Sequence, residues 1–123
     1  DMARVTLFRR EVLGFPITAA VTRAGDDLLV QVAGGCREHI GSVSTARFEN
    51  GELKIDSLLL PHHRDDVVGD KFAKALAERS RATVTVVCGI HFDSPGRDGI
   101  REIVECTDSL LEDILSSDVI SDK

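Results

Sequence analysis

The pattern of hydrophobic and polar positions divides the chain into a strand-rich first half and a second half with helical spacing. In the first half, short apolar runs alternate with polar positions and end at turn residues. This pattern predicts five strands, at residues 4–12, 17–23, 28–33, 42–48 and 53–60. Asn50-Gly51 favours a tight hairpin between the last two strands, because both residues tolerate positive φ. The first strand alternates imperfectly, with Val5, Leu7 and Arg9 on one face.

Helical spacing first appears after residue 65. Apolar side chains recur three or four residues apart, at Val68, Phe72, Ala75 and Leu76. Asp65 or Asp66 is expected to cap the N-terminus of this helix, since a carboxylate accepts hydrogen bonds from the first free N–H groups.

A sixth strand and a second helix follow. Residues 82–90 form a continuous β-branched run, which is typical of a strand buried on both faces. Ser94 and Pro95 then predict a helix start, with the serine as N-cap and the proline in the first turn. The apolar face of this long helix extends from Ile100 to Leu115.

The element order β-β-β-β-β-α-β-α predicts an α+β fold, with a mostly antiparallel sheet of about six strands and two helices packed on one face. We expect a single domain over residues 3–116 and a polar, frayed tail over residues 117–123. If the first five strands form a meander, the third and fifth run in the same direction. A right-handed crossover through the first helix then makes the sixth strand parallel to the fifth.

Three turn-like segments at the ends of these strands contain all four histidines. The segments are residues 34–41 with His39, residues 61–66 with His62 and His63, and residues 89–96 with His91. Histidine titrates near neutral pH and binds metals and anions, and loops often carry function. Because the third, fifth and sixth strands are expected to share a direction, the three segments should lie on one edge of the sheet and form a common site.

Composition narrows the class of protein. The 123 residues carry a net charge of −6, which argues against nucleic-acid binding, since phosphate neutralisation needs a basic surface. No run approaches the roughly 18 apolar residues of a membrane span, and no signal peptide is expected. Cys36, Cys88 and Cys106 are too far apart for a zinc knuckle and odd in number for a disulfide framework. A cytoplasmic location follows, with Cys88 expected to be buried.

Metal binding and acid–base catalysis are two possible roles of the histidine segments. A zinc, iron or nickel site would use imidazole and carboxylate ligands, although the spacing matches no known signature. Its candidate ligands are His39, His63, His91 and Asp93. A general base with an orienting partner could be Asp93 beside His91, or Asp65 and Asp66 near His63. No triad is recognisable, so the sequence leans away from an enzyme.

Anion binding is a third possible role. Gly34, Gly35 and Gly41 could leave backbone N–H groups free to approach a phosphate, or they could simply form tight turns. Donors and positive charge would come from Arg37, His39 and Arg64. The positive end of the second helix, near Asp93, adds to this field.

Short glycine- and histidine-containing motifs give the chain a family resemblance. They are Leu28-Leu29-Val30 followed by Gly34-Gly35, then His39-Ile40-Gly41, His63-Arg64-Asp65-Asp66 and Gly89-Ile90-His91. With these motifs, the chain resembles the prenylated flavin chaperone LpdD-like family of bacteria and archaea. Members are encoded with prenylated-flavin-dependent decarboxylases, and their domain is related in fold to proteasome assembly chaperones. The resemblance implies signature positions at Gly34, Gly35, His39, Gly41, His63, Arg64, Asp65 and His91.

The resemblance implies a non-catalytic accessory protein that binds a flavin-type phosphorylated cofactor, such as FMN or prenylated FMN, or a client decarboxylase. The implied cofactor-binding set is Gly34, Gly35, Arg37, His39, Gly41, His63, Arg64, Asp65 and His91. An aromatic content of 4% favours a transient carrier over a permanent flavin site. A homodimer is expected, since sheet edges are usually covered or paired. The alternatives are a metal-dependent enzyme and a protein-interaction module without a small-molecule ligand.

Overall fold

The computed structural model describes residues 4–61 and 65–121, and its elements follow the order expected from the sequence with one short helix added. The strands and helices are β1 (Val5–Val12), β2 (Phe15–Ala24), β3 (Asp27–Gly35), β4 (Ser42–Glu49), β5 (Glu52–Leu59), α1 (Asp66–Ser80), β6 (Val84–His91), α2 (Gly96–Leu115) and α3 (Asp118–Ser121). The α+β class and the mostly antiparallel six-stranded sheet are therefore confirmed.

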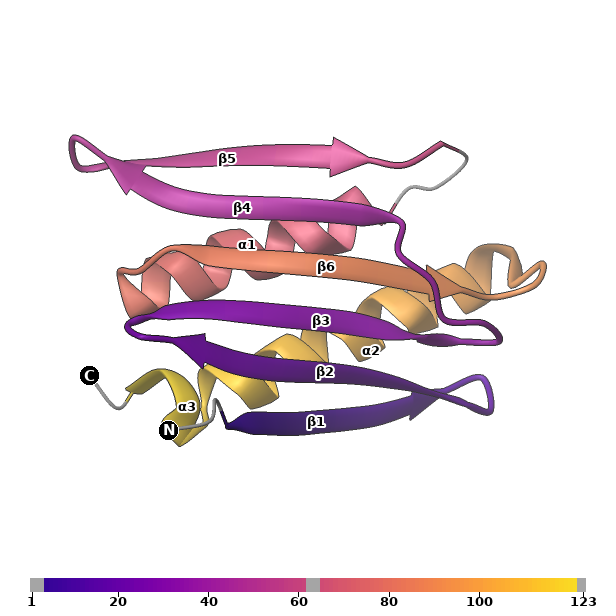
Figure 1. Ribbon diagram of the computed structural model, residues 1–123. Coiled ribbons are helices and arrows are strands. Elements are labelled where there is room, and N and C mark those ends of the chain that lie inside the picture. Colours follow the sequence, from indigo (N-terminus) through magenta and orange to yellow (C-terminus); the bar gives the residue numbers. More distant parts are fainter. Residues whose placement is uncertain (1–3, 62–64, 122–123) are drawn as a thin grey trace.

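The strand order of the sheet is β1-β2-β3-β6-β4-β5, with β6 inserted between β3 and β4 (Figure 1). β3 and β6 are parallel, and every other neighbouring pair is antiparallel. The expected five-strand meander is wrong, because β3 is not paired with β4. The number of chain reversals along the sequence determines the direction of each strand but not which strand lies beside it. The directions themselves are confirmed: β3, β5 and β6 all end at the same edge of the sheet.

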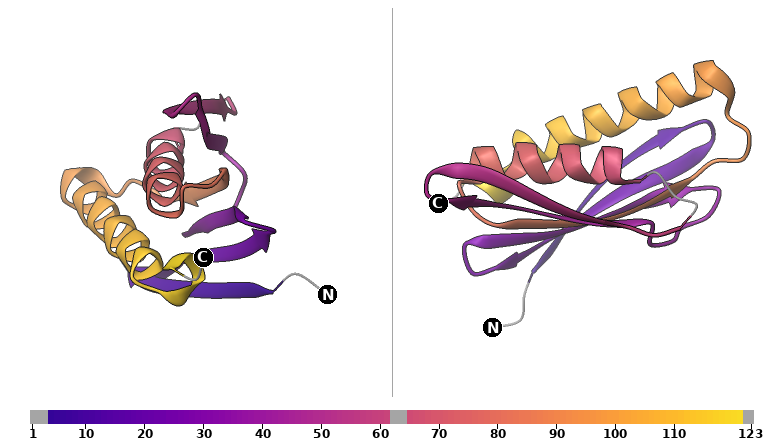
Figure 2. Two further views of the ribbon diagram at one scale, coloured as in Figure 1. Left: turned by 90° about the vertical axis from the view of Figure 1, so that its left-hand side faces the viewer. Right: turned by 90° about the horizontal axis from the view of Figure 1, so that it is seen from above.

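The hydrophobic core lies between one face of the sheet and the two long helices (Figure 2). In β6 the side chains of Val84, Val86 and Cys88 point into this core and are fully buried, whereas Thr85 and Val87 on the opposite face are half-buried. The expectation that this strand is buried on both faces is therefore wrong, since no helix of the described residues covers the second face. The largest buried side chains from the helices are Phe72, Leu76, Leu110 and Ile114.

Small side chains on β4 allow α1 to lie close to the sheet. Ser42 and Ser44 are fully buried beneath Gly69 of the helix. The Asp70 carboxylate accepts hydrogen bonds from the hydroxyls of Ser44 (2.6 Å) and Ser57 (2.5 Å). One helical carboxylate thus connects α1 to both β4 and β5, which fixes where the N-terminal end of this helix lies over the sheet.

The ends of α2 differ from the sequence-based expectation. Pro95, not Ser94, is the N-cap residue, and no side chain caps this helix. Ser94 instead has a positive φ of 42° in the turn before the helix. Beyond Leu115 the chain does not fray at once, because residues 118–121 form α3 and Ile120 is buried against the core.

The helix α2 covers the β1–β2 end of the sheet. Arg10 of β1 donates two hydrogen bonds to Asp113 of α2, at 2.8 and 3.0 Å. This contact with Arg10 lowers the pKa of the Asp113 carboxyl below its ordinary value of 3.8, chiefly through the hydrogen bond and against a smaller opposing effect of desolvation. Across residues 4–61 and 65–121, no helix is long and apolar enough to cross a membrane.

We predict that Asp113→Asn destabilises the fold by a small amount at about pH 7. The pKa of Asp113 is lower in the folded than in the unfolded chain, so its contribution is present above the unfolded value and is lost as the pH falls through the folded value. Denaturant unfolding should therefore separate variant and parent at neutral pH, and the separation should vanish as the pH falls below the lowered pKa of Asp113 in the folded chain. Asp98→Asn, which removes an exposed carboxylate paired with Arg101 on the same helix, is the control and should show a smaller separation at neutral pH.

Candidate functional site

The Asp65 carboxylate connects three segments at the edge where β3, β5 and β6 end. Its Oδ1 accepts a hydrogen bond from the backbone N–H of Ile90 (3.0 Å), and its Oδ2 lies 3.0 Å from Nε2 of His39. An ionised carboxylate only accepts hydrogen bonds, so Nε2 of His39 is the donor. Both side chains are largely buried, with 9% of the Asp65 side chain and 17% of the His39 side chain exposed. We call this group the Asp65 hub.

The position of Asp65 corrects one expectation from the sequence. Asp65 does occupy the N-cap position of α1, but its side chain makes no capping hydrogen bond to the helix. The carboxylate turns instead toward His39 and Ile90, which are distant in sequence. A buried carboxylate with two strong partners outside its own helix is a tertiary contact, and it holds the loop of residues 36–41 against the end of β6.

Glycines make this loop crossing possible. Because β6 lies between β3 and β4, the chain from β3 must cross the end of β6 before it enters β4. At the crossing, a Cβ on Gly89 would lie 1.6 Å from the carbonyl oxygen of His39, and a Cβ on Gly41 would lie 1.9 Å from Oδ2 of Asp65. Any larger residue at either position would push the loop away from the sheet.

The glycine amides are less free than an anion cradle requires. Gly34 and Gly35 belong to β3, where they pair with Ile17 of β2 and with the end of β6. The N–H of Gly41 donates to the carbonyl of Cys88 (2.9 Å). The glycines at this edge therefore serve close packing of backbone on backbone, and side chains are the better candidates for ligand contact.

His91 forms a second histidine–aspartate pair at the same edge. Its Nε2 lies 2.9 Å from Oδ1 of Asp93, with 35% of the histidine side chain and 80% of the aspartate side chain exposed. Since the backbone of His39 contacts Gly89, two residues before His91, the two histidines are close neighbours on this edge. Arg37 is exposed on the loop between them. His39 is thus held inside the protein, whereas His91 and Arg37 face solvent.

The candidate metal ligands do not gather in the described part of the chain. Within residues 4–61 and 65–121, no group of three His, Cys, Asp or Glu side chains has the geometry to hold a metal ion. His39 and His91 each pair with a different aspartate. His62, His63 and Arg64 lie outside the described residues, so their predicted roles stay predictions.

Two of the three cysteines are buried, and burial disfavours the reactive thiolate form of both. Cys88 is fully buried, as expected, and burial together with the nearby charge of Asp65 raises the pKa of its thiol far above the ordinary value. Burial also raises the pKa of the Cys106 thiol, against a smaller opposing effect of Arg10. Cys36 is the exposed thiol, and it lies in the loop that carries Arg37 and His39.

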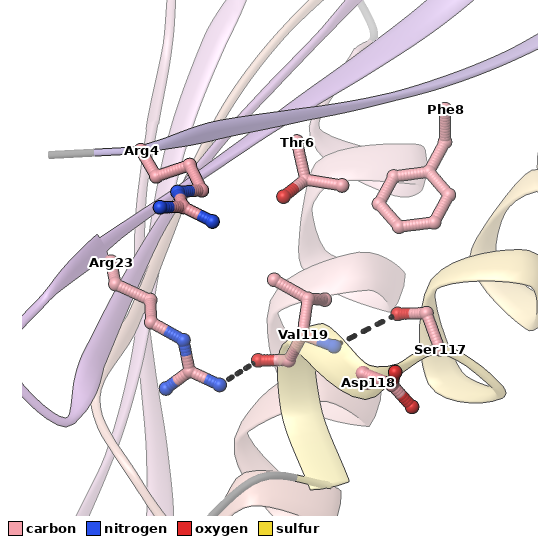
Figure 3. A pocket seen from close by; sticks show the side chains of 7 residues that line it. All are labelled: Arg4, Thr6, Phe8, Arg23, Ser117, Asp118 and Val119. Atoms are coloured by element: carbon pink, nitrogen blue, oxygen red, sulfur yellow. Dashed lines mark hydrogen bonds between the residues drawn. The ribbon is translucent and has the colours of Figure 1, made fainter.

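The opposite edge of the sheet has a pocket that the sequence reasoning missed. Its volume is about 390 Å³, and it lies where β1 and β2 meet the turn between α2 and α3 (Figure 3). Its lining residues are Arg4, Thr6, Phe8, Arg23, Ser117, Asp118 and Val119. A signal for it was present: a hairpin turn at residues 13–14 places Arg4 opposite Arg23.

Comparison with known proteins gives a consistent result. The model of the family described as the prenylated flavin chaperone LpdD-like domain matches residues 11–117. Protein LpdD of Lactiplantibacillus plantarum (strain ATCC BAA-793 / NCIMB 8826 / WCFS1) is 30% identical over 111 residues, which cover 89% of this chain and 82% of that protein.

Among solved structures, the chain is similar to one from the crystal structure of a novel chaperone complex for yeast 20S proteasome assembly. The TM-score is 0.50 with 14% sequence identity, over 90% of this chain and 92% of that chain. At this identity the likeness shows a shared fold only, which agrees with the expectation from the sequence that the fold is related to that of proteasome assembly chaperones.

We predict that Asp65→Ala destabilises the protein by about 2–4 kcal/mol, because it removes the carboxylate that accepts from the part-buried N–H of Ile90 and from Nε2 of His39. Amide hydrogen exchange should accelerate at Ile90 and across residues 36–41. Asp93→Ala removes the carboxylate of the exposed histidine pair and is the matched control, with an expected loss below about 0.5 kcal/mol. Equal losses for the two variants would show that the Asp65 hub does not hold the loop.

Proposed function

The chain belongs to the prenylated flavin chaperone LpdD-like family, and we propose that it is a cytoplasmic, non-catalytic accessory protein. In this proposal it binds a flavin-type phosphorylated cofactor, FMN or prenylated FMN, for a client decarboxylase. The family match over residues 11–117 is the observation that carries this proposal. Binding is transient in this account, which suits a chain with no Trp or Tyr and with 4% aromatic residues.

The proposed contact surface is the edge that carries the Asp65 hub. Candidate donors there are the exposed guanidinium of Arg37 and the half-buried imidazole of His91, which pairs with Asp93. Arg64 and His63 belong to the adjoining segment of the sequence. Guanidinium and imidazole groups are suitable donors to a phosphate or to the carbonyl edge of a flavin ring. His39 supports this surface from within, because its ring is held by Asp65.

The sharpest test compares FMN binding by variants of the exposed Arg37 and the half-buried His91. Arg37→Ala and His91→Ala should each weaken FMN binding about tenfold, the loss expected for one charge-assisted hydrogen bond, while thermal stability stays the same. Isothermal titration calorimetry measures the affinity. Arg79→Ala, an exposed arginine in the last turn of α1 and thus at the other edge, is the matched control and should bind like the parent.

Two results would contradict the proposal. A stoichiometric metal ion in the purified protein that is lost on His91→Ala would support a metal-dependent enzyme instead. If the parent binds neither FMN nor prenylated FMN, the surface would belong to a protein-interaction module without a small-molecule ligand.

We also propose that the protein is a homodimer formed through the sheet face that the helices leave uncovered. The strand pairing places one residue from each strand in a single row across this face: Leu7, Ala20, Gln31, Val87, Val43 and Leu58. Leu7, Leu29 and Leu58 on this face are 67%, 46% and 60% exposed. Exposed apolar side chains gathered on one face are typical of an interface.

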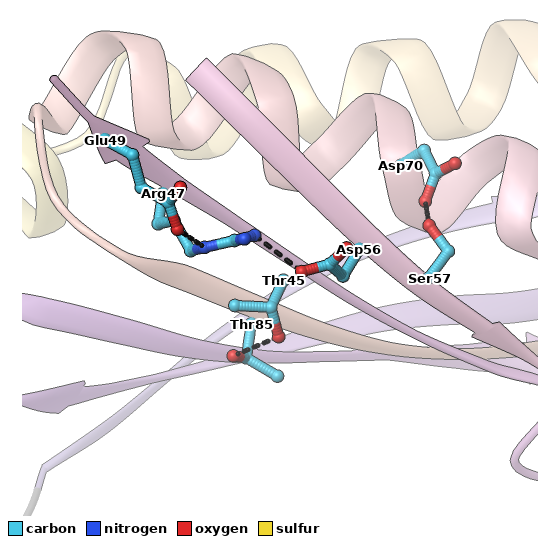
Figure 4. A network of polar contacts seen from close by, with 7 residues as sticks. All are labelled: Thr45, Arg47, Glu49, Asp56, Ser57, Asp70 and Thr85. Carbon is cyan, nitrogen blue, oxygen red and sulfur yellow. Dashed lines mark hydrogen bonds and ion pairs between the residues drawn. The ribbon is translucent and has the colours of Figure 1, made fainter. Parts of the chain in front are cut away.

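The same face also carries polar side chains, which are paired with one another and would add little to the cost of forming such an interface. The hydroxyls of Thr45 and Thr85 hydrogen-bond to each other at 2.9 Å, and Arg47 forms ion pairs with Glu49 and Asp56 (Figure 4). These groups already satisfy one another, so covering them costs less than burying unpaired charges. Six strands of about eight residues span on the order of 650 Å², close to the roughly 800 Å² per partner of a standard interface.

Sedimentation of the parent chain at micromolar concentration should give a dimer. Leu29→Asp places a charge in the middle of the uncovered face and should yield a monomer with an unchanged circular dichroism spectrum. Val67→Asp, which changes a similarly exposed apolar residue on α1, should remain a dimer. A monomeric parent, or a Leu29→Asp variant that still dimerises, would rule out this face as the interface.

A further inference from the structure

We propose that the pocket between the β1–β2 edge and the α2–α3 turn binds a phosphate monoester attached to a flat ring. This site lies at the edge of the sheet opposite the Asp65 hub. Arg4 directly precedes β1 and Arg23 is the last residue but one of β2, whereas the hub lies where β3, β5 and β6 end. A ligand can therefore bind in this pocket whether or not a ligand is bound at the Asp65-hub edge.

Two arginines from neighbouring strands give the pocket its charge. Val5 of β1 pairs with Thr22 of β2, and the two strands are antiparallel. The residues next to this pair, Arg4 and Arg23, therefore lie opposite each other. Figure 3 shows both guanidinium groups pointing into the same space. Like charges opposite each other on adjacent strands are unfavourable unless an anion lies between them. The sheet thus holds two cationic groups together at a cost that a bound anion would offset.

Among the residues that the structure describes, few groups occupy the N–H donors of the two arginines. Arg23 donates from Nη2 to the backbone carbonyl of Val119, which uses one of the five N–H groups of a guanidinium. Arg4 forms no ion pair with any residue in the ranges 4–61 and 65–121. The backbone contact holds Arg23 in a fixed orientation, and such preorganisation lowers the entropy lost when an anion binds.

The remaining residues that line the pocket indicate which group could be attached to the bound anion. Phe8 presents an aromatic ring and Thr6 a hydroxyl group toward the same space (Figure 3). Asp118 also lines the pocket, so two arginines and one aspartate leave one net positive charge. A guanidinium pair matches phosphate oxygens bidentately, and Phe8 offers an apolar surface for a ring joined to that phosphate. The volume of about 390 Å³ lies within the usual range for small-molecule pockets.

Phenyl phosphate is the probe that tests this assignment, with phenol and inorganic phosphate as its two halves. Amide chemical shifts of the full chain should respond to phenyl phosphate at residues 4–8, 23 and 117–119, with a higher affinity than for inorganic phosphate and no saturable response to phenol. Arg4→Gln should weaken phenyl phosphate binding about tenfold, because it removes one charge-assisted contact. Asp118→Asn should strengthen binding several-fold, because it removes the opposing charge from the pocket wall.

Arg9→Gln is the matched control. It removes the same charge from the same strand, but its side chain lies on the other face of the sheet, where it pairs with Glu11. This variant should bind phenyl phosphate within twofold of the parent. The assignment is wrong if Arg4→Gln and Arg9→Gln weaken binding equally, which would indicate general charge attraction, or if Asp118→Asn leaves the affinity unchanged. Failure of FMN to bind at the Asp65-hub edge would leave these outcomes unaffected.

Discussion

The buried contact between Asp65, His39 and the backbone of Ile90 is the interaction on which the arrangement of one whole sheet edge depends. The contact joins the loop before β4, the start of α1 and the end of β6, which are separated by about 25 residues each along the chain. A carboxylate with 9% exposure is costly to bury unless its oxygens are satisfied. Because both oxygens are satisfied here, the hub holds the loop in one place and leaves Arg37 and His91 facing solvent.

The insertion of β6 between β3 and β4 explains why this hub is needed. It obliges the β3–β4 connection to cross the end of β6, and the crossing works only with a glycine at position 89 and another at position 41. The same topology gathers both long helices on one face and leaves Leu7, Leu29 and Leu58 uncovered on the other. The molecule therefore has the edge that carries the Asp65 hub, an uncovered apolar face and, at the far edge, an arginine-lined pocket.

Local patterns predicted the elements well because alternation and helical spacing are properties of short segments. Strand directions also followed from the order of elements, so the common edge of His39 and His91 was predictable. The neighbour of β6 was not, because the choice depends on which strand faces best fit α1, and the small residues Ser42 and Ser44 show this only in three dimensions. The sequence likewise predicts a helix cap at Asp65 and not its partners His39 and Ile90, because both are distant in sequence.

We propose that FMN-type ligands bind this protein at the Asp65-hub edge. Amide chemical-shift mapping during an FMN titration of the full chain tests it most directly. We expect the largest shifts in residues 36–41 and 89–94, around Arg37 and His91. Shifts confined to residues 4–8, 23 and 117–119, or spread evenly over the sheet, would contradict it.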